Sequence, residues 1–134
     1  MDSDPRERFE NWRNPDIEDG ELTKYNWVVN SPENLELAEY VDIGAFTVIN
    51  AHAGVVIEEG VQIGSHCAVH SRSTIDQKQG KVRIEEGAKV GSHTVILPGV
   101  RIGKNAVIGA QSLVNDDVSE GEVVAGVPAE ELNS

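Results

Sequence analysis

Aliphatic residues recur at every sixth position along most of this chain. An α-helix repeats its side-chain directions every 3.6 residues and a β-strand every 2, so neither element accounts for a period of six. Two short insertions, near His52 and Ala53 and within the segment DQKQGK, divide the pattern into three series. A fixed period overrides local propensity and predicts a repeat architecture. The thirteen positions are Leu37, Ile43 and Ile49; Ile57, Ile63, Val69 and Ile75; and Ile84, Val90, Ile96, Ile102, Ile108 and Val114.

The residues around the aliphatic positions are also constrained. A glycine often follows the aliphatic residue, and a small or β-branched residue often stands four positions after it. Each hexapeptide therefore reads as one short strand and one corner of a triangular coil, with both kinds of side chain inside the prism. Three hexapeptides make a coil of about 18 residues, so the chain is predicted to be an all-β parallel β-helix of about four to five triangular coils. The glycines are Gly44, Gly64, Gly91, Gly103 and Gly109, and the small or β-branched residues are Cys67, Ala88, Thr94, Val100, Ala106 and Ser112.

The first part of the chain lacks the six-residue period. We expect residues 1–34 to form a polar, irregular cap segment, and residues 35–134 to form the β-helix domain with a short C-terminal tail. Within the cap, Pro5 to Arg13 is expected to form a short helix, and the YNWVV segment a lead-in strand. The open end of a β-helix exposes unpaired backbone groups, so the first coil needs such a cover.

The charge of the chain narrows the choice of partners. It holds 11 Lys and Arg against 23 Asp and Glu, a formal net charge of −12. Nucleic-acid binding needs a basic face, so no nucleic-acid partner is expected. No run of about 18 apolar residues occurs, so no membrane partner is expected either. The acids are spread along the chain, which fits either solubility or a cytoplasm of high salt.

The N-terminus and the cysteine content favour a cytoplasmic location. The segment MDSDPRERFENWRNPD lacks the apolar stretch of a signal peptide. Cys67 is the single cysteine, so no disulfide framework exists and a reducing compartment is expected. Because Cys67 occupies an inward small-residue position, we interpret it as a packing residue rather than a nucleophile.

The segment VGSHTVILPGVRIGKNAVIGAQSLVNDDVSEGEVVAGVPAEEL resembles the C-terminal half of hexapeptide-repeat acyltransferases, in particular galactoside and other sugar O- and N-acetyltransferases. The resemblance covers residues 35–132, more loosely in its upstream part. It implies a left-handed β-helix and a homotrimer with active sites in the grooves between neighbouring prisms. It also implies acetyl-CoA as a co-substrate, no permanently bound cofactor and no metal.

The same resemblance implies the path of coenzyme A. In galactoside-type relatives the pantetheine arm follows coil corners near "GSH" and "GAGS" motifs, which here place Ser92 and Ala110 beside it, acting mainly through their backbone. Each of the two residues also simply fits a coil corner, so both interpretations stay open.

The phosphate end of that path departs from the family pattern. Relatives commonly have Thr-Lys where this chain has Asn115–Asp116, and basic residues where it has Glu130–Glu131. Acids repel the phosphates of coenzyme A, although molar salt shortens the Debye length to about 3 Å and softens the effect. Asn115 and Lys104 are the candidate contacts at this end, with Arg101 as an alternative to Lys104.

The four histidines supply the candidate general bases. Relatives carry the base in a loop between coils, but the corresponding loop STIDQKQGKV has no histidine. His66, at a predicted corner before that loop, is the first candidate, and His52, in the two-residue insertion, is the second, with Asn50 beside it to orient a base or acceptor. His70 follows a core residue, and His93 belongs to the "GSH" motif. A mechanism without a histidine base also stays open, since an amine acceptor can enter neutral.

The resemblance thus predicts an acyltransferase that moves an acetyl or short acyl group from acyl-CoA to an amine or hydroxyl of a sugar or sugar nucleotide, with an amino sugar favoured. Two alternatives come from other classes. One is a zinc enzyme like the γ-type carbonic anhydrases, suggested by GSHCAVHS, although His66 and His70 stand four residues apart where that family needs five. The other is a non-catalytic β-helix scaffold, which the acidic replacements at the phosphate end favour.

Overall fold

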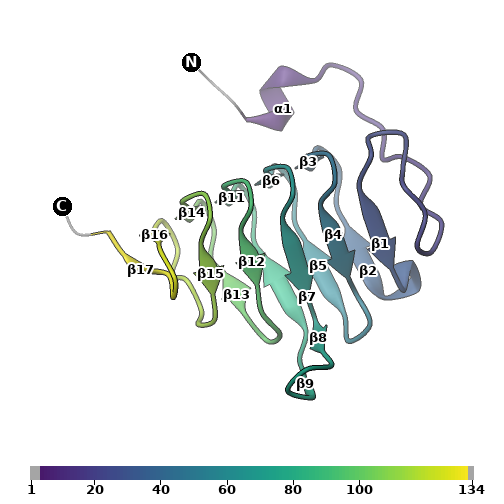
Figure 1. Cartoon of the computed structure of the whole chain (residues 1–134). Helices are drawn as coiled ribbons and strands as arrows, with labels where there is room; N and C mark the ends of the chain where they lie inside the picture. Colours follow the sequence, from purple (N-terminus) through teal and green to yellow (C-terminus); the bar gives the residue numbers. More distant parts are fainter. Residues whose placement is uncertain (1–3, 133–134) are drawn as a thin grey trace.

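The computed structural model describes residues 4–132 and shows a parallel β-helix with three faces (Figure 1). Five strands on face A mark five coils, so the predicted all-β solenoid is confirmed. Face A contains β1 (Val28–Asn30), β4 (Val48–Asn50), β7 (Ala68–His70), β12 (Val95–Ile96) and β15 (Leu113–Val114). Face B contains β2 (Leu35–Leu37), β5 (Val55–Ile57), β10 (Val82–Ile84) and β13 (Arg101–Ile102). Face C contains β3 (Asp42–Ile43), β6 (Gln62–Ile63), β11 (Lys89–Val90), β14 (Val107–Ile108), β16 (Val123–Ala125) and the antiparallel β17 (Glu130–Glu131).

The predicted aliphatic ladder forms the core of the prism. All but two of its thirteen positions are buried; Leu37 is partly buried and packs against the core. The small residues four positions after the aliphatic, such as Ala88 and Thr94, are buried as predicted. Each inward side chain therefore stacks on its counterpart in the next coil, and the apolar column runs the length of the prism.

Ile75 is the exception, and its assignment to the core is wrong. Its side chain is 97% exposed. After Ser71 the chain leaves the coil and forms a hairpin of β8 (Arg72–Ser73) and β9 (Lys78–Gln79), and it rejoins the prism just before β10. The second insertion is thus longer than three residues, and the six-residue spacing of Ile75 is coincidental.

Three edges join the faces, and each takes its name from the two faces that it connects. The C–A edge consists of residues 44–47, 64–67, 91–94 and 109–112. The A–B edge consists of residues 31–34, 51–54, 71–81, 97–100 and 115–117. The B–C edge consists of residues 38–41, 58–61, 85–88, 103–106 and 119–122.

The C–A edge turns in the same way in successive coils. Its third residue has a left-handed backbone, with φ of 59° at His66 and 60° at His93. Glycine precedes that turn because the coils approach closely there: a Cβ on Gly91 would lie 2.5 Å from the backbone N of Ala110. The periodic glycine of the sequence therefore reflects coil-to-coil contact as well as turning.

The cap segment lies along the prism and is fastened at the B–C edge. Its helix α1 (Pro5–Arg8) is shorter than the predicted Pro5–Arg13, because the chain becomes extended at Phe9. The Phe9 ring packs edge-on against Trp12, which in turn contacts Tyr40 of the first B–C corner, so contacts with the prism replace further helical turns.

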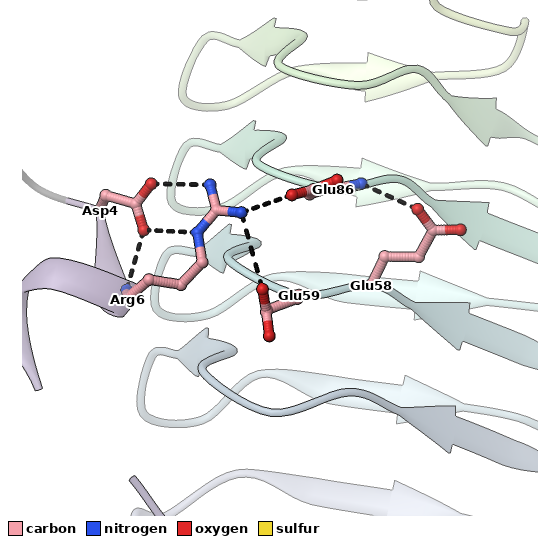
Figure 2. Close-up of polar contacts among 5 residues, drawn as sticks. All are labelled: Asp4, Arg6, Glu58, Glu59 and Glu86. Atoms are coloured by element: carbon pink, nitrogen blue, oxygen red, sulfur yellow. Dashed lines mark hydrogen bonds and ion pairs between the residues drawn. The ribbon is translucent and has the colours of Figure 1, made fainter. Parts of the chain in front are cut away.

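Arg6 holds the cap against two coils (Figure 2). Its Nη1 lies 2.6 Å from Oε2 of Glu86 and 3.8 Å from Oε2 of Glu59, and its Nη2 lies 2.8 Å from Oδ2 of Asp4. This bonding raises the pKa of Arg6 and holds the pKa of the Asp4 carboxyl below its usual value. The guanidinium is thus surrounded by acids from two coils and from its own cap.

In the structure, the prism begins earlier in the chain than the hexapeptide series predicts. β1 pairs in parallel with β4, as expected of a lead-in strand, and Trp27 just before it is buried. The outer ends of the two predicted domains, residues 1–3 and 133–134, lie outside the described residues. Within residues 4–132, no helix has the length and apolar character needed to cross a membrane.

Candidate functional site

The A–B edge differs from coil to coil, and it holds most of the departures from the repeat. The first corner contains the 3-10 helix η1 (Pro32–Asn34), the second carries the insertion with His52, and the third carries the β8–β9 hairpin. Figure 1 shows this hairpin projecting from the lower end of β7, away from the prism. Polar side chains from these irregular corners are therefore free to come together outside the core.

His52, Asn50 and Arg72 form one cluster on this edge. Nη1 of Arg72 lies 2.9 Å from Nε2 of His52. The backbone N–H of His52 donates to Oδ1 of Asn50 at 3.2 Å, and Nδ2 of Asn50 donates to the carbonyl of Arg72 at 3.5 Å. The register explains the meeting, because Asn50 pairs with His70 between β4 and β7, which places His52 and Arg72 at equivalent points of successive coils.

The contact with Arg72 indicates which nitrogen of the His52 ring accepts a hydrogen bond. An arginine guanidinium always donates, so Nε2 must be the accepting nitrogen and the ring proton resides on Nδ1. In this contact Nε2 of His52 faces a donor. An amine or hydroxyl that takes the place of Arg72 would meet a nitrogen able to accept its proton.

Ser71 fixes the base of the hairpin to the same corner. Its buried hydroxyl donates to the carbonyl of Asn50 at 2.7 Å and accepts from the backbone N–H of Ala53 at 2.9 Å. Sequence reasoning missed both Ser71 and Arg72. The only signal was their position in HSRS, directly before the insertion.

His70 lies on face A beside Asn50. Its side chain is half-buried, and burial lowers the pKa of the imidazole. His70 therefore resists protonation more than an exposed histidine does. Asn115 begins the A–B edge directly after β15, two coils beyond His70, and it is exposed.

The C–A edge holds the other histidine candidate. His66 is exposed and its ring stacks on His93 at 4.9 Å with an interplanar angle of 5°. Phe46 lies on the other side, 5.4 Å from His66. Ser92 and Ala110, the predicted coenzyme A contacts, lie on the same edge as these rings.

Cys67 lies in the same corner as His66 but points inward. It is buried, and its Sγ lies 3.2 Å from the carbonyl oxygen of Gly91. Burial raises the pKa of the thiol. This environment disfavours the thiolate, as expected of a packing residue.

Lys104 and Arg101, the alternative phosphate contacts, are placed differently. Lys104 is exposed on the B–C edge, where its carbonyl accepts from Gly121. Arg101 lies on face B, where its Nε donates to Oε2 of Glu85 at 2.8 Å and this bonding raises the pKa of the arginine. The charge of Arg101 is thus already compensated within the chain.

The candidate residues accordingly divide into two groups. His52 and Asn50 meet on the A–B edge, whereas His66, Ser92 and Ala110 share the C–A edge. Both edges border face A. The five residue steps from His66 on the C–A edge to Ser71, which holds the His52 corner of the A–B edge, correspond to roughly 16 Å. Within one chain, His66 and His52 therefore do not act on the same atom. In the part of the chain that the structure describes, no three His, Cys, Asp or Glu side chains gather as metal ligands.

Sequence comparison identifies hexapeptide repeats in this chain. The family described as bacterial transferase hexapeptide (six repeats) matches residues 81–116. The chain is 36% identical over 103 residues to a galactoside O-acetyltransferase of Lactococcus lactis subsp. lactis (strain IL1403), which covers 66% of this chain and 50% of the relative. The chain thus spans about half the length of that curated relative.

Solved structures share the fold. A hexapeptide-repeat-containing acetyltransferase of Vibrio cholerae O1 biovar eltor, complexed with acetyl coenzyme A, superposes with a TM-score of 0.74 and is 26% identical, covering 81% of this chain and 64% of that one. A maltose O-acetyltransferase of Clostridium difficile 630 superposes with a TM-score of 0.73 at 21% identity, covering 80% of this chain and 62% of that one. The second likeness shows the fold alone.

Proposed function

We propose, from the premise that this chain belongs to the hexapeptide-repeat acetyltransferase family, that it transfers an acetyl group from acetyl-CoA to a hydroxyl or amine of a sugar or sugar nucleotide. The observation that carries the proposal is the contact of His52 with Asn50 and Arg72 on the A–B edge, which holds the His52 ring at the surface with Nε2 facing a donor. The name of the galactoside O-acetyltransferase relative supports a sugar acceptor.

The proposed reaction is a direct transfer in a ternary complex. Nε2 of His52 takes the proton of the acceptor as the acceptor attacks the thioester carbonyl carbon. The carbon–sulfur bond then breaks, and the thiolate of coenzyme A leaves and takes up a proton. Backbone N–H groups near the coil corners stabilise the oxyanion, and Asn50 keeps the His52 corner in position. His66 remains the alternative base.

The site is proposed to lie between two copies of the chain in a homotrimer. The A–B edge of one copy contributes His52 and Asn50, and the C–A edge of the next contributes the corners of Ser92 and Ala110 to the pantetheine arm. This arrangement uses both groups of candidate residues, which one chain holds on opposite borders of face A. It also leaves Asn115, at the A–B border, near the proposed groove, whereas Lys104 lies on the remaining edge.

Thiol release from acetyl-CoA tests the proposal. The assay uses a panel of sugars, amino sugars and sugar nucleotides, at low and at molar KCl, with wild type, His52→Ala and His66→Ala. We expect turnover with at least one acceptor and a loss of about 10²–10⁴-fold in kcat for His52→Ala. His93→Ala, which removes the stacking partner of His66, serves as the matched control.

The outcomes separate the two bases. A loss confined to His66→Ala would transfer the role of base to the C–A edge and keep the transferase. Equal turnover in all variants would support a reaction without a histidine base. Absence of thiol release under every condition would contradict the transferase.

One observation favours a second function, that of a non-catalytic scaffold. The last strand β17 consists of Glu130 and Glu131, both exposed, and Asp116 and Asp117 are exposed on the A–B edge. By the resemblance, Asp116, Glu130 and Glu131 stand where relatives commonly carry basic residues, at the phosphate end of the coenzyme A path. Calorimetric titration with acetyl-CoA distinguishes the two functions, because a scaffold that has lost its donor site binds none at either salt concentration.

A further inference from the structure

Arg72 differs from most arginines of this chain in having no acidic partner. Four of the six arginines form ion pairs with carboxylates, and these are Arg6, Arg8, Arg83 and Arg101. Within residues 4–132, no carboxylate forms an ion pair with Arg72. Its charge is therefore uncompensated in a chain with a net charge of −12, where carboxylates are abundant.

The hydrogen bonding of Arg72 is also incomplete. Its Nη1 meets Nε2 of His52, but its Nε is buried and has no hydrogen-bond partner among the described residues. A buried N–H without an acceptor costs about 1–3 kcal/mol and calls for an explanation. Arg72 thus has a guanidinium that lacks a counter-charge and an Nε that lacks an acceptor.

The backbone of Arg72 is held in place by its surroundings. The backbone carbonyl of Arg72 accepts from Asn50, and the residue begins β8, whose base Ser71 ties to the His52 corner. The nearest ion pair of the hairpin joins Asp76 and Lys78 to each other and leaves Arg72 out. An arginine on a held backbone, with a guanidinium that has an unpaired Nε, is suited to bidentate recognition of a carboxylate or phosphate.

We propose that Arg72 binds an anionic group of the acceptor, a phosphate or a carboxylate, and so selects anionic sugars over uncharged ones. The inference rests on the proposed transferase function and specifies its substrate class. When the anion draws the guanidinium outward, Nε gains an acceptor, and Nε2 of His52 loses its contact with Nη1. Binding of the correct acceptor thereby frees the basic nitrogen of His52.

Coenzyme A is the other source of phosphate, and the position of Arg72 argues against it. The phosphates of coenzyme A are separated from its thioester by the whole pantetheine arm. Arg72 touches His52, where the proposed proton transfer takes place. An anion bound there belongs to the molecule whose hydroxyl or amine reacts, and not to the distant end of the donor.

Calorimetric titration tests this assignment without depending on turnover. The probes are glucosamine 1-phosphate, glucosamine 6-phosphate and glucuronic acid as anionic sugars, glucosamine and glucose as sugars without an acidic group, and coenzyme A with 3′-dephospho-coenzyme A for the donor. The variants are Arg72→Gln, Arg72→Lys and, as a matched control, Arg83→Gln, which removes an arginine paired with Glu58 on face B. A thermal unfolding curve of each variant verifies that it is folded.

The expected result is that Arg72→Gln weakens binding of at least one anionic sugar about tenfold to hundredfold, with no change for the sugars without an acidic group. Arg72→Lys, which keeps the charge and loses the fork, restores part of the affinity, and Arg83→Gln has no effect. With an acceptor that turns over, the loss appears in KM for the anionic sugar. If the wild type binds anionic sugars more tightly and Arg72→Gln removes that preference, but no acceptor turns over, the result would support the Arg72 assignment and contradict the transferase.

Three results would overturn the assignment. The first is that the wild type binds no anionic sugar more tightly than the matching sugar without an acidic group. Equal losses in Arg72→Gln and Arg83→Gln are the second, because they indicate a general effect of charge. The third is a loss confined to coenzyme A that 3′-dephospho-coenzyme A does not show, since this would assign Arg72 to the donor.

Discussion

The two edges that border face A are built in opposite ways. Along the C–A edge each coil turns with the same sequence of glycine, small residue, left-handed residue and buried small residue, and His66 stacks on His93 from one coil to the next. Along the A–B edge a 3-10 turn, an insertion and a hairpin follow one another, and His52 contacts Arg72. The regular edge serves the stacking of the coils, whereas the irregular edge collects polar groups with unused hydrogen-bonding capacity.

The difference shows where a repeat protein has room for chemistry. A corner that must stack on identical corners above and below accepts few side chains. A corner that leaves the stack, as the β8–β9 hairpin does, is free of that constraint. Substitutions at matched positions of the two edges test this division.

The largest contrast is expected between two isoleucines of the six-residue series. Ile96→Ala removes a fully buried side chain and should lower the free energy of unfolding by about 2–5 kcal/mol. Ile75→Ala, in the hairpin of the A–B edge, should change it by less than about 0.5 kcal/mol because the side chain is 97% exposed. Urea unfolding followed by circular dichroism measures both, and a comparable loss for the two would contradict the hairpin.

Two glycines provide the next contrast. Gly91→Ala on the C–A edge would place a Cβ 2.5 Å from the backbone N of Ala110, and the overpacking should cost roughly 3 kcal/mol. Gly99→Ala on the A–B edge meets no atom within 4 Å, and only its left-handed backbone, with φ of 82°, opposes the substitution, at about 1 kcal/mol. The same unfolding experiment ranks them, and a reversed order would refute close coil contact at the C–A edge.

The smallest effect concerns the pH dependence of stability. Burial lowers the pKa of His70, so the folded state binds a proton less readily than the unfolded chain, whose histidines titrate near pH 6.5. Protonation therefore favours unfolding, and the contribution of His70 to stability is lost as the pH falls below about 6.5. We expect His70→Gln to lose less stability than wild type between about pH 7.5 and pH 5.5. Identical pH profiles would assign the acid sensitivity to other groups.

The fold was predictable from the sequence because every coil repeats the same requirements. The positions of Ile96 and Ile102 in the core follow from counting in sixes, and both are buried. Counting failed at Ile75 because nothing in the local sequence distinguishes an aliphatic residue of a coil from one in a hairpin. The length of α1 was mispredicted for a related reason, since Trp12 packs against Tyr40, a contact that is distant in sequence.

The candidate site was less accessible to sequence reasoning. The insertion near His52 was visible, and Asn50 beside it was a reasonable partner. The role of Arg72 was not, because its contact with His52 depends on the register of β4 with β7. Likewise, the sequence treats His66 and His52 as rivals for one role, and only the three-dimensional arrangement separates them onto two edges.

The central claim is that the A–B edge of one copy and the C–A edge of the next form one active site. Mixed assembly of two inactive variants tests it: His52→Ala removes the proposed base, and Ala110→Trp blocks the proposed pantetheine path. Unfolding the two together and refolding them at equal amounts should restore thiol release to about a quarter of the wild-type rate, because about a quarter of the interfaces combine an intact A–B edge with an intact C–A edge. If the site lay within one chain, each copy would carry a defect and the mixture would stay as inactive as either variant alone.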